Sequence, residues 1–162
     1  MTTEPEPGGV VVGVDGGGAS RTAIKMAAQE ARYRGVPLIA VMAYSGEGAV
    51  GAPPGRPVAT LRTGVNERGG AESALRAAVV DALGAGAGRV ELRTALGLAG
   101  RNLVDVARGV NAQLIVLAGR GSTSMLLGTV SQYVLRKAPC PVLVVPEGRW
   151  SPTAPALAGR KP

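Results

Sequence analysis

The first residues that could bind a ligand are an aspartate and three glycines, Asp15 to Gly18. They follow the apolar, β-branched run Val10–Val14, which is typical of a strand buried on both faces of a parallel sheet. A carboxylate at such a strand end could accept hydrogen bonds from ribose hydroxyls, and glycines would let a ligand approach the backbone. Asp and Gly also favour turns on their own account, so a helix-capping turn explains the same residues equally well.

A second group of candidate residues follows another apolar run, Leu114–Ala118. Glycines and hydroxyl side chains follow this run and precede the predicted start of a helix. Free backbone N–H groups and the positive end of the helix dipole at such a start favour the binding of a phosphate. The group does not match a Walker loop, because it lacks Gly-Lys-Ser/Thr, and Ser124 stands where GxGxxG requires its third glycine. The candidate residues are Ala118, Gly119, Gly121, Gly128, Thr129 and Val130.

A third candidate, Ala43, ends the apolar run Leu38–Ala43, which is entered through Pro37. Its small side chain would leave room for a planar ring against the end of a strand. Considered alone, the position is better explained as an ordinary core alanine.

The composition excludes several classes of chemistry. The chain has no histidine, which rules out a histidine base, a Ser-His-Asp triad and histidine metal ligands. Its single cysteine, Cys140, rules out an intramolecular disulfide and a multi-thiolate metal site. Because Cys140 lies just before an apolar run and free cysteines are usually buried, we expect it to pack rather than react. We therefore predict neither catalytic residues nor a metal site.

The candidate residues depend on alternating strands and helices. Such alternation predicts parallel strands joined by right-handed crossovers, with helices on both faces of the sheet, and ligands bind beyond the carboxyl ends of such strands. We expect helices from about Ser20, as a capping residue, to Gly35, and around Leu75–Ala82, Leu103–Val110 and Val130–Lys137. The predicted strands are Val10–Val14, Leu38–Ala43, Val90–Thr94, Leu114–Ala118 and Val142–Val145.

One domain, residues 10–148, accounts for this pattern. Residues 1–9 are predicted to be a flexible leader, residues 45–70 a long Gly/Pro-rich loop, and residues 149–162 a disordered basic tail. Neither a secretory signal nor an apolar stretch long enough to span a bilayer is recognisable, so a cytoplasmic location without membrane contact is expected. The net charge is +7, but the arginines are dispersed and often lie beside acids, which makes nucleic-acid binding unlikely.

Two segments resemble the universal stress protein family. Val-Gly-Val-Asp-Gly at 12–16, with Ser20 and Ala23, resembles the family's opening, and the segment from Ala118-Gly-Arg-Gly-Ser to the strand ending at Val145 is similar to its closing part. The resemblance covers residues 10–146. It implies a three-layer α/β/α, doubly wound, five-stranded parallel sheet of the adenine nucleotide alpha hydrolase-like kind, with strand order 3-2-1-4-5. It also implies a cytoplasmic, usually homodimeric protein from either an ATP-binding or a non-binding branch.

The same resemblance assigns roles to the candidate residues. In binding members the counterpart of Asp15 contacts the ribose with Gly13 near it, and the counterpart of Ala43 contacts adenine through its backbone. The phosphates are held by a loop of the form Gly-x-x-Gly-x9-Gly-Ser/Thr, which Gly128 and Thr129 close. Ala118 stands at that loop's first glycine. Only six residues separate Gly121 from Gly128, so three are missing.

These departures leave the binding of ATP or AMP open, although Gly119 could partly replace the missing glycine. The leading hypothesis is a regulatory module that binds an adenine nucleotide. The alternatives are an interaction or scaffold protein that has lost the nucleotide and, less favoured because Asp15 is the only acid near the site, a slow ATP hydrolase. The short apolar strand Val142–Val145 is expected at a sheet edge, where it would pair with its copy in a homodimer.

Overall fold

The computed structural model describes residues 8–45, 68–119 and 128–147. Five strands form one sheet, and all four neighbouring pairs are parallel, in the order β3-β2-β1-β4-β5. The strands are β1 (Val10–Gly13), β2 (Leu38–Tyr44), β3 (Val90–Leu96), β4 (Leu114–Ala118) and β5 (Val142–Val145). The predicted fold class and strand order are confirmed.

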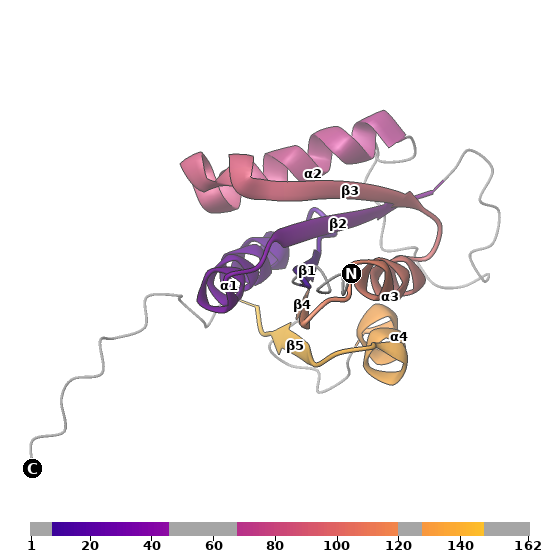
Figure 1. The fold of residues 1–162 in the computed structure, drawn as a ribbon. Helices are drawn as coiled ribbons and strands as arrows, with labels where there is room; N and C mark the ends of the chain where they lie inside the picture. The colour runs from indigo at the N-terminus through magenta and orange to yellow at the C-terminus, as the bar shows by residue number, and fades with distance from the viewer. Residues whose placement is uncertain (1–7, 46–67, 120–127, 148–162) are drawn as a thin grey trace, which may run out of the picture.

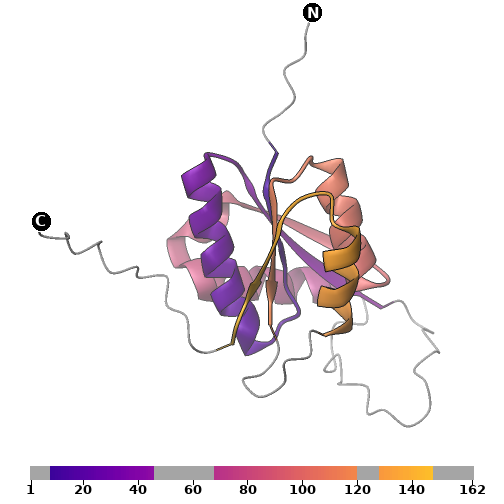
Figure 2. The ribbon, with the colours of Figure 1, turned by 90° about the horizontal axis from the view of Figure 1, so that it is seen from below.

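Helices cover both faces of this sheet, giving three layers (Figures 1 and 2). One face carries α1 and α2, and the other carries α3 and α4. The helices are α1 (Gly18–Arg34), α2 (Arg68–Leu83), α3 (Ala99–Gly109) and α4 (Thr129–Lys137), and the 3-10 helix η1 (Gly84–Arg89) joins α2 to β3. The two layers are held to the sheet by separate apolar clusters, because β1 lies in the centre of the sheet and buries its valines on both faces.

Val10 and Val12 of β1 point into the cluster beneath α1 and α2, where Ile24 and Leu75 are fully buried. Val11 points the other way, into the cluster of Leu103 and Val134 beneath α3 and α4. The continuous valine run is thus explained by burial on both faces. With no phenylalanine in the chain, aliphatic side chains fill both clusters.

Most element boundaries follow the local chemistry of the sequence. Helix α1 ends where Gly35 adopts φ 65°, a left-handed conformation that glycine tolerates best, and the amide of Val36 donates to the carbonyl of Ala31. The expectation of a loop over residues 45–70 is wrong at its end, because α2 already begins at Arg68; residues 46–67 lie outside the described part. Likewise the predicted leader falls mostly outside it, while Gly9 accepts a hydrogen bond from the amide of Gln113.

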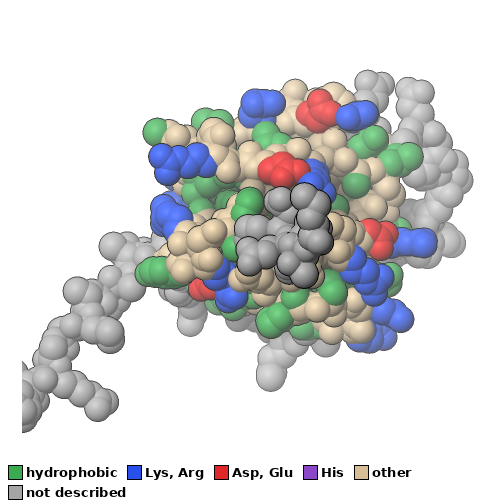
Figure 3. Space-filling view, in the orientation of Figure 1, with side chains coloured by type: hydrophobic (Ala, Val, Ile, Leu, Met, Phe, Trp, Pro, Cys, Tyr) green, Lys and Arg blue, Asp and Glu red, His purple; other side chains and the backbone are tan. Residues whose placement is uncertain are grey.

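Charged side chains of both signs are interspersed over the face shown in Figure 3. Six ion pairs join described residues, and one of them, Arg21 with Asp81 at 3.5 Å, connects α1 to α2. Such exposed pairs each contribute at most about 1 kcal/mol to stability. Among the described residues, no helix is long and apolar enough to cross a membrane.

Candidate functional site

The carboxyl ends of β1, β2 and β4 meet at one edge of the sheet, which is the lower edge in Figure 2. The strand register aligns these ends. Gly13 pairs with Val41, and Asp15 and Ala43 each lie two residues further along, so they are at the same level of the sheet. Val12 pairs with Val116 in the same way, so Ala118 lies level with Val14. Residues from three separate parts of the sequence are thereby brought together at the predicted place.

Asp15 is exposed at this edge, and its carboxylate is held by two hydrogen bonds. Atom Oδ1 accepts one from the Ser20 hydroxyl at 2.7 Å and one from the Gly17 amide at 2.8 Å. The Ser20 hydroxyl also accepts a hydrogen bond from the Asp15 amide at 3.1 Å. Ser20 is 1% exposed, so the two hydrogen bonds that its side chain makes with Asp15, called the Ser20 brace below, are partly buried, whereas Asp15 itself is exposed.

The expectation that Ser20 caps the first helix is wrong. The N-cap is Gly17, in an extended conformation, and Ser20 lies inside α1 with its amide bonded to the Gly17 carbonyl. The turn is tighter than expected: Gly16 adopts φ 79°, and the helix is capped three residues earlier than predicted, at Gly17 rather than Ser20. Ser20 therefore positions Asp15, a role that sequence reasoning missed. The five-residue spacing between an aspartate and a serine across a glycine turn was the available signal.

Close packing around the end of β1 requires a glycine at position 13. A Cβ there would lie 3.0 Å from both the Leu103 and Leu117 side chains, closer than real Cβ contacts normally allow. The glycine thus lets α3 and β4 approach the end of β1. Ala43 is half-buried in β2, which extends one residue further than expected, to Tyr44, and Ala43 is paired with Ala95 of β3.

Gly119 follows β4 directly, and its amide is already engaged. It donates to the carbonyl of Val145 at 2.7 Å, and a Cβ at this position would lie 3.3 Å from Val144. A ligand could therefore touch Gly119 through its Cα or its carbonyl, but its N–H is committed to β5. Ala118 is half-buried, and Gly121 lies outside the described residues.

Gly128 is the N-cap of α4, and Thr129 and Val130 form its exposed first turn. Within the described residues no side chain caps this helix, and its first turn carries no acid. The amides of a first turn have no partner inside the helix, so they can donate to an anion or to water. The predicted helix start is confirmed, and it lies at the same edge as Asp15 (Figure 2).

The titratable groups at this edge are few. Over residues 8–45, 68–119 and 128–147 there is no group of three or more His, Cys, Asp or Glu side chains that could hold a metal ion. Cys140 lies apart from the site, half-buried against the cluster beneath α3 and α4, and burial raises the pKa of its thiol. The edge therefore offers hydrogen-bond acceptors and helix amides rather than a pair of acid–base groups.

Comparison with known proteins gives a consistent result. A family model described as the universal stress protein family matches residues 9–146. Universal stress protein Rv2623 of Mycobacterium tuberculosis (strain ATCC 25618 / H37Rv) is 32% identical over 139 residues, which are 85% of this chain and 47% of the relative. The chain thus spans about half the length of the curated relatives it matches.

Solved structures share the fold. A universal stress protein crystallised in complex with cAMP is 30% identical, with a TM-score of 0.62 over 85% of this chain and 95% of that one. The universal stress protein from Archaeoglobus fulgidus in complex with dAMP is 23% identical, with a TM-score of 0.52 over 84% of this chain and 95% of that one. At that identity, the second similarity bears on the fold alone.

Proposed function

The chain belongs to the universal stress protein family, and from that premise we propose that it is a regulatory module that binds an adenine nucleotide at the carboxyl edge of β1, β2 and β4. The cAMP complex of a relative 30% identical to this chain supports an adenine ligand.

The position of Asp15 carries this proposal. In the order β3-β2-β1-β4-β5 the chain turns to opposite sides of β1, so the crevice between the ends of β1 and β4 is the switch point where open α/β sheets bind ligands. Asp15 lies two residues beyond β1, at that crevice, and Ser20 and Gly17 hold its carboxylate. A carboxylate fixed in this way suits a ribose, because its position is set before the ligand arrives.

The other candidates would hold the remaining parts of the ligand. The backbone at Ala43 would contact the base, and the first-turn amides of Thr129 and Val130 would face a phosphate. Among the described residues the Gly119 amide is already engaged with Val145, and the Cβ of Ala118 would crowd a phosphate where binding members have a glycine. Of the two nucleotides considered, we therefore favour AMP over ATP as the ligand.

A second candidate function is an interaction module without a nucleotide. The observation that favours it is the spacing of only six residues between Gly121 and Gly128. For either function we propose binding without catalysis. The chain has no histidine, and among the described residues Asp15 is the one acidic side chain placed at the site, so we assign no second group for general acid–base catalysis.

We also propose a cytoplasmic homodimer formed through β5. This strand pairs with β4 on one side only, lies at the end of the sheet, and carries the wholly apolar sequence VLVV. Val142, Leu143 and Val144 are only half-buried, so pairing with a second copy would cover both apolar side chains and an open backbone edge.

Mass analysis of molecules released from freshly purified protein tests the ligand. Recovery of AMP, cAMP or ATP in near-stoichiometric amount supports the nucleotide module. Protein that is empty, and that stays unchanged in a thermal shift assay with each of these nucleotides, would support the interaction module instead. Conversion of added ATP to ADP by the wild type but not by Asp15→Asn would contradict the proposal of binding without catalysis.

A further inference from the structure

A cavity of about 280 Å³ opens at the opposite edge of the sheet from Asp15. Leu38 and Val90, the first residues of β2 and β3, form part of its lining. Because Leu38 and Ala43 are five residues apart in β2, this cavity and the edge near Ala43 are separated by about 17 Å of strand. The two places are therefore independent, and the cavity plays no part in the proposed nucleotide site.

The interior of this cavity is apolar. Ala28 and Ala31 of α1 face Leu83 at the end of α2 across it, and η1 contributes Gly86. Gly86 lines the cavity without a side chain, and a Cβ there would lie 3.8 Å from the Leu83 Cβ, at ordinary contact distance, so this position has room for a larger residue. A volume of this size lies just below the range of typical small-molecule sites.

Two arginines border the apolar interior, Arg32 from α1 and Arg89 from η1. Neither has an ion-pair partner in the described part of the chain, whereas six other arginines there do: Arg21, Arg34, Arg68, Arg93, Arg101 and Arg108.

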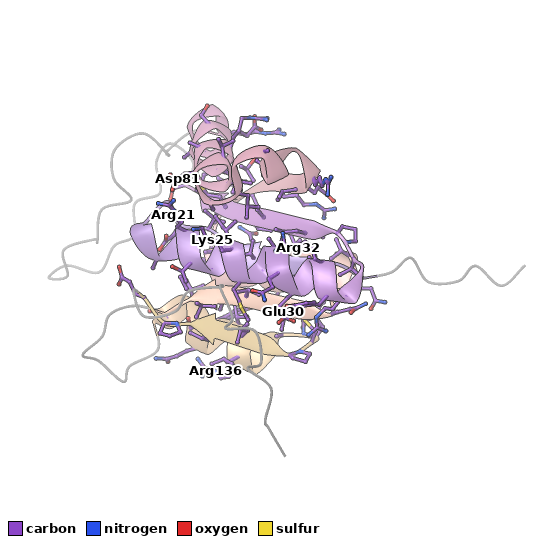
Figure 4. The ribbon with its side chains drawn as sticks, turned by 90° about the vertical axis from the view of Figure 1, so that its left-hand side faces the viewer. Arg21, Lys25, Glu30, Arg32, Asp81 and Arg136 are labelled. Atoms are coloured by element: carbon purple, nitrogen blue, oxygen red, sulfur yellow. The ribbon has the colours of Figure 1, made fainter. Side chains whose placement is uncertain are left out.

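The neighbouring acids are already occupied. Glu30 pairs with Arg34 at 3.2 Å, and Glu91 is bonded to Arg93. Figure 4 shows why Glu30 does not reach Arg32: Arg32 lies on the edge of α1 that borders α2, with Arg21 and Lys25, and Glu30 lies on the other edge. On the left of Figure 3, basic side chains and hydrophobic atoms lie next to one another.

The charges near this cavity favour an anion on balance. The carboxyl ends of α1 and α2 contribute about −0.5 elementary charge each. The two guanidinium groups contribute +2, and two carbonyls in the last turn of α1, those of Arg32 and Ala31, are already bonded to the amides of Gly35 and Val36. The net local charge is thus about +1, beside an apolar space.

We propose that this cavity binds a small amphipathic carboxylate, with its apolar body between α1 and α2 and its carboxylate against Arg32 and Arg89. An arginine fork matches a carboxylate in geometry as well as in charge, so the pair would select a free acid over a neutral molecule of the same shape.

Nuclear magnetic resonance of the full chain labelled with ¹⁵N tests this proposal, with octanoate as the probe. We expect saturable shifts at the amides of Gly35 and Gly86, which line the cavity, and none at Gly17. Octanol has the same chain without the charge, and acetate has the charge without the chain, so both should bind much more weakly. Absence of saturable shifts at millimolar octanoate, or equal binding of octanol, would overturn the proposal.

Substitutions locate the site. Arg32→Gln and Arg89→Gln should each weaken octanoate binding by roughly two- to fivefold, the range for exposed ion pairs. Arg76→Gln is the matched control, because Arg76 is also exposed and without an ion pair among the described residues but does not line the cavity. Equal losses in all three variants would contradict a role for Arg32 and Arg89.

Gly86→Leu should fill the cavity and abolish octanoate binding while circular dichroism stays unchanged. A Gly86→Leu variant that binds octanoate as well as wild type would overturn the location. The proposal would also be overturned if the wild type is an oligomer and Gly86→Leu alone dissociates it, because a second copy of the chain would then occupy the cavity. Only the Gly17 control lies at the nucleotide edge, and no nucleotide is added in any of these measurements, so their failure is separate from a failure of the proposed function.

Discussion

The Ser20 hydroxyl donates a 2.7 Å hydrogen bond to the Asp15 carboxylate and accepts a 3.1 Å bond from the Asp15 amide. One buried side chain in the first helix therefore fixes both the backbone and the carboxylate at the end of the central strand. The proposed ribose contact depends on this brace.

Removing the brace should weaken ligand binding without destroying the fold. Ser20→Ala loses both hydrogen bonds, which we expect to lower the free energy of unfolding by about 1–2 kcal/mol and to weaken adenine-nucleotide binding. Ser20→Thr keeps the hydroxyl and should bind better than Ser20→Ala. Ser73→Ala, at an exposed position in α2, is the control. Calorimetric titration that finds Ser20→Ala and wild type equal in affinity would show that the brace has no role in binding.

Long apolar runs and helical spacing report burial directly, so they predicted the strands, the helices and the layers. The strand order was predicted by the resemblance to the universal stress protein family. The run Val10–Val14 predicted a strand buried on both faces, and its four valines are buried. Ser20 was misassigned because a serine near a helix start is usually a cap, and the positive φ of Gly16 that moves the start cannot be read from a run of glycines.

Two further properties of the site depend on contacts between distant segments. The engagement of the Gly119 amide by Val145 joins residues 26 positions apart and leaves no local signal. The packing of Leu103 and Leu117 around Gly13 is equally non-local, so this requirement for a glycine could not be predicted before its neighbours were known.

Lengthening the phosphate loop should improve nucleotide binding. Inserting three residues between Gly121 and Gly128, together with Ala118→Gly, restores the spacing of binding members and should raise the affinity for ATP by recovering N–H donors. Ala118→Gly alone is the control for the backbone effect. If the restored variant keeps its circular dichroism spectrum but binds ATP no better than wild type, loop length is not what limits binding.

A charge in β5 should disrupt the proposed dimer. Val144→Lys places an ammonium group at the open edge of the sheet, where antiparallel pairing of two copies would bring two such charges together. Light scattering should give a dimeric mass for the wild type and a monomeric mass for this variant, with Val80→Lys, at an exposed position in α2, remaining dimeric. A monomeric wild type at micromolar concentration would refute the dimer.

Cys140 should react slowly in the native protein. Burial raises the pKa of its thiol, so at any pH below that value less thiolate is present than in the unfolded chain. Iodoacetamide labelling should therefore be slower in native than in denaturant-unfolded protein near pH 7. Its rate should rise with pH through a midpoint above that of the unfolded chain. Because the chain has one cysteine, the labelled mass reports this site alone, and equal midpoints would contradict the prediction.

The most direct measurement is calorimetric titration of AMP, cAMP and ATP into wild type and Asp15→Asn. Asparagine keeps an oxygen that can accept from Ser20 and Gly17, so the turn should persist while the negative charge is lost. We predict that at least one nucleotide binds the wild type and binds Asp15→Asn more weakly by about 1–3 kcal/mol, the range for hydrogen bonds to a charged group. Asp105→Asn, on the exposed face of α3, should bind like wild type. Equal affinities in Asp15→Asn and wild type, or no binding of any of the three nucleotides to the wild type, would contradict the account.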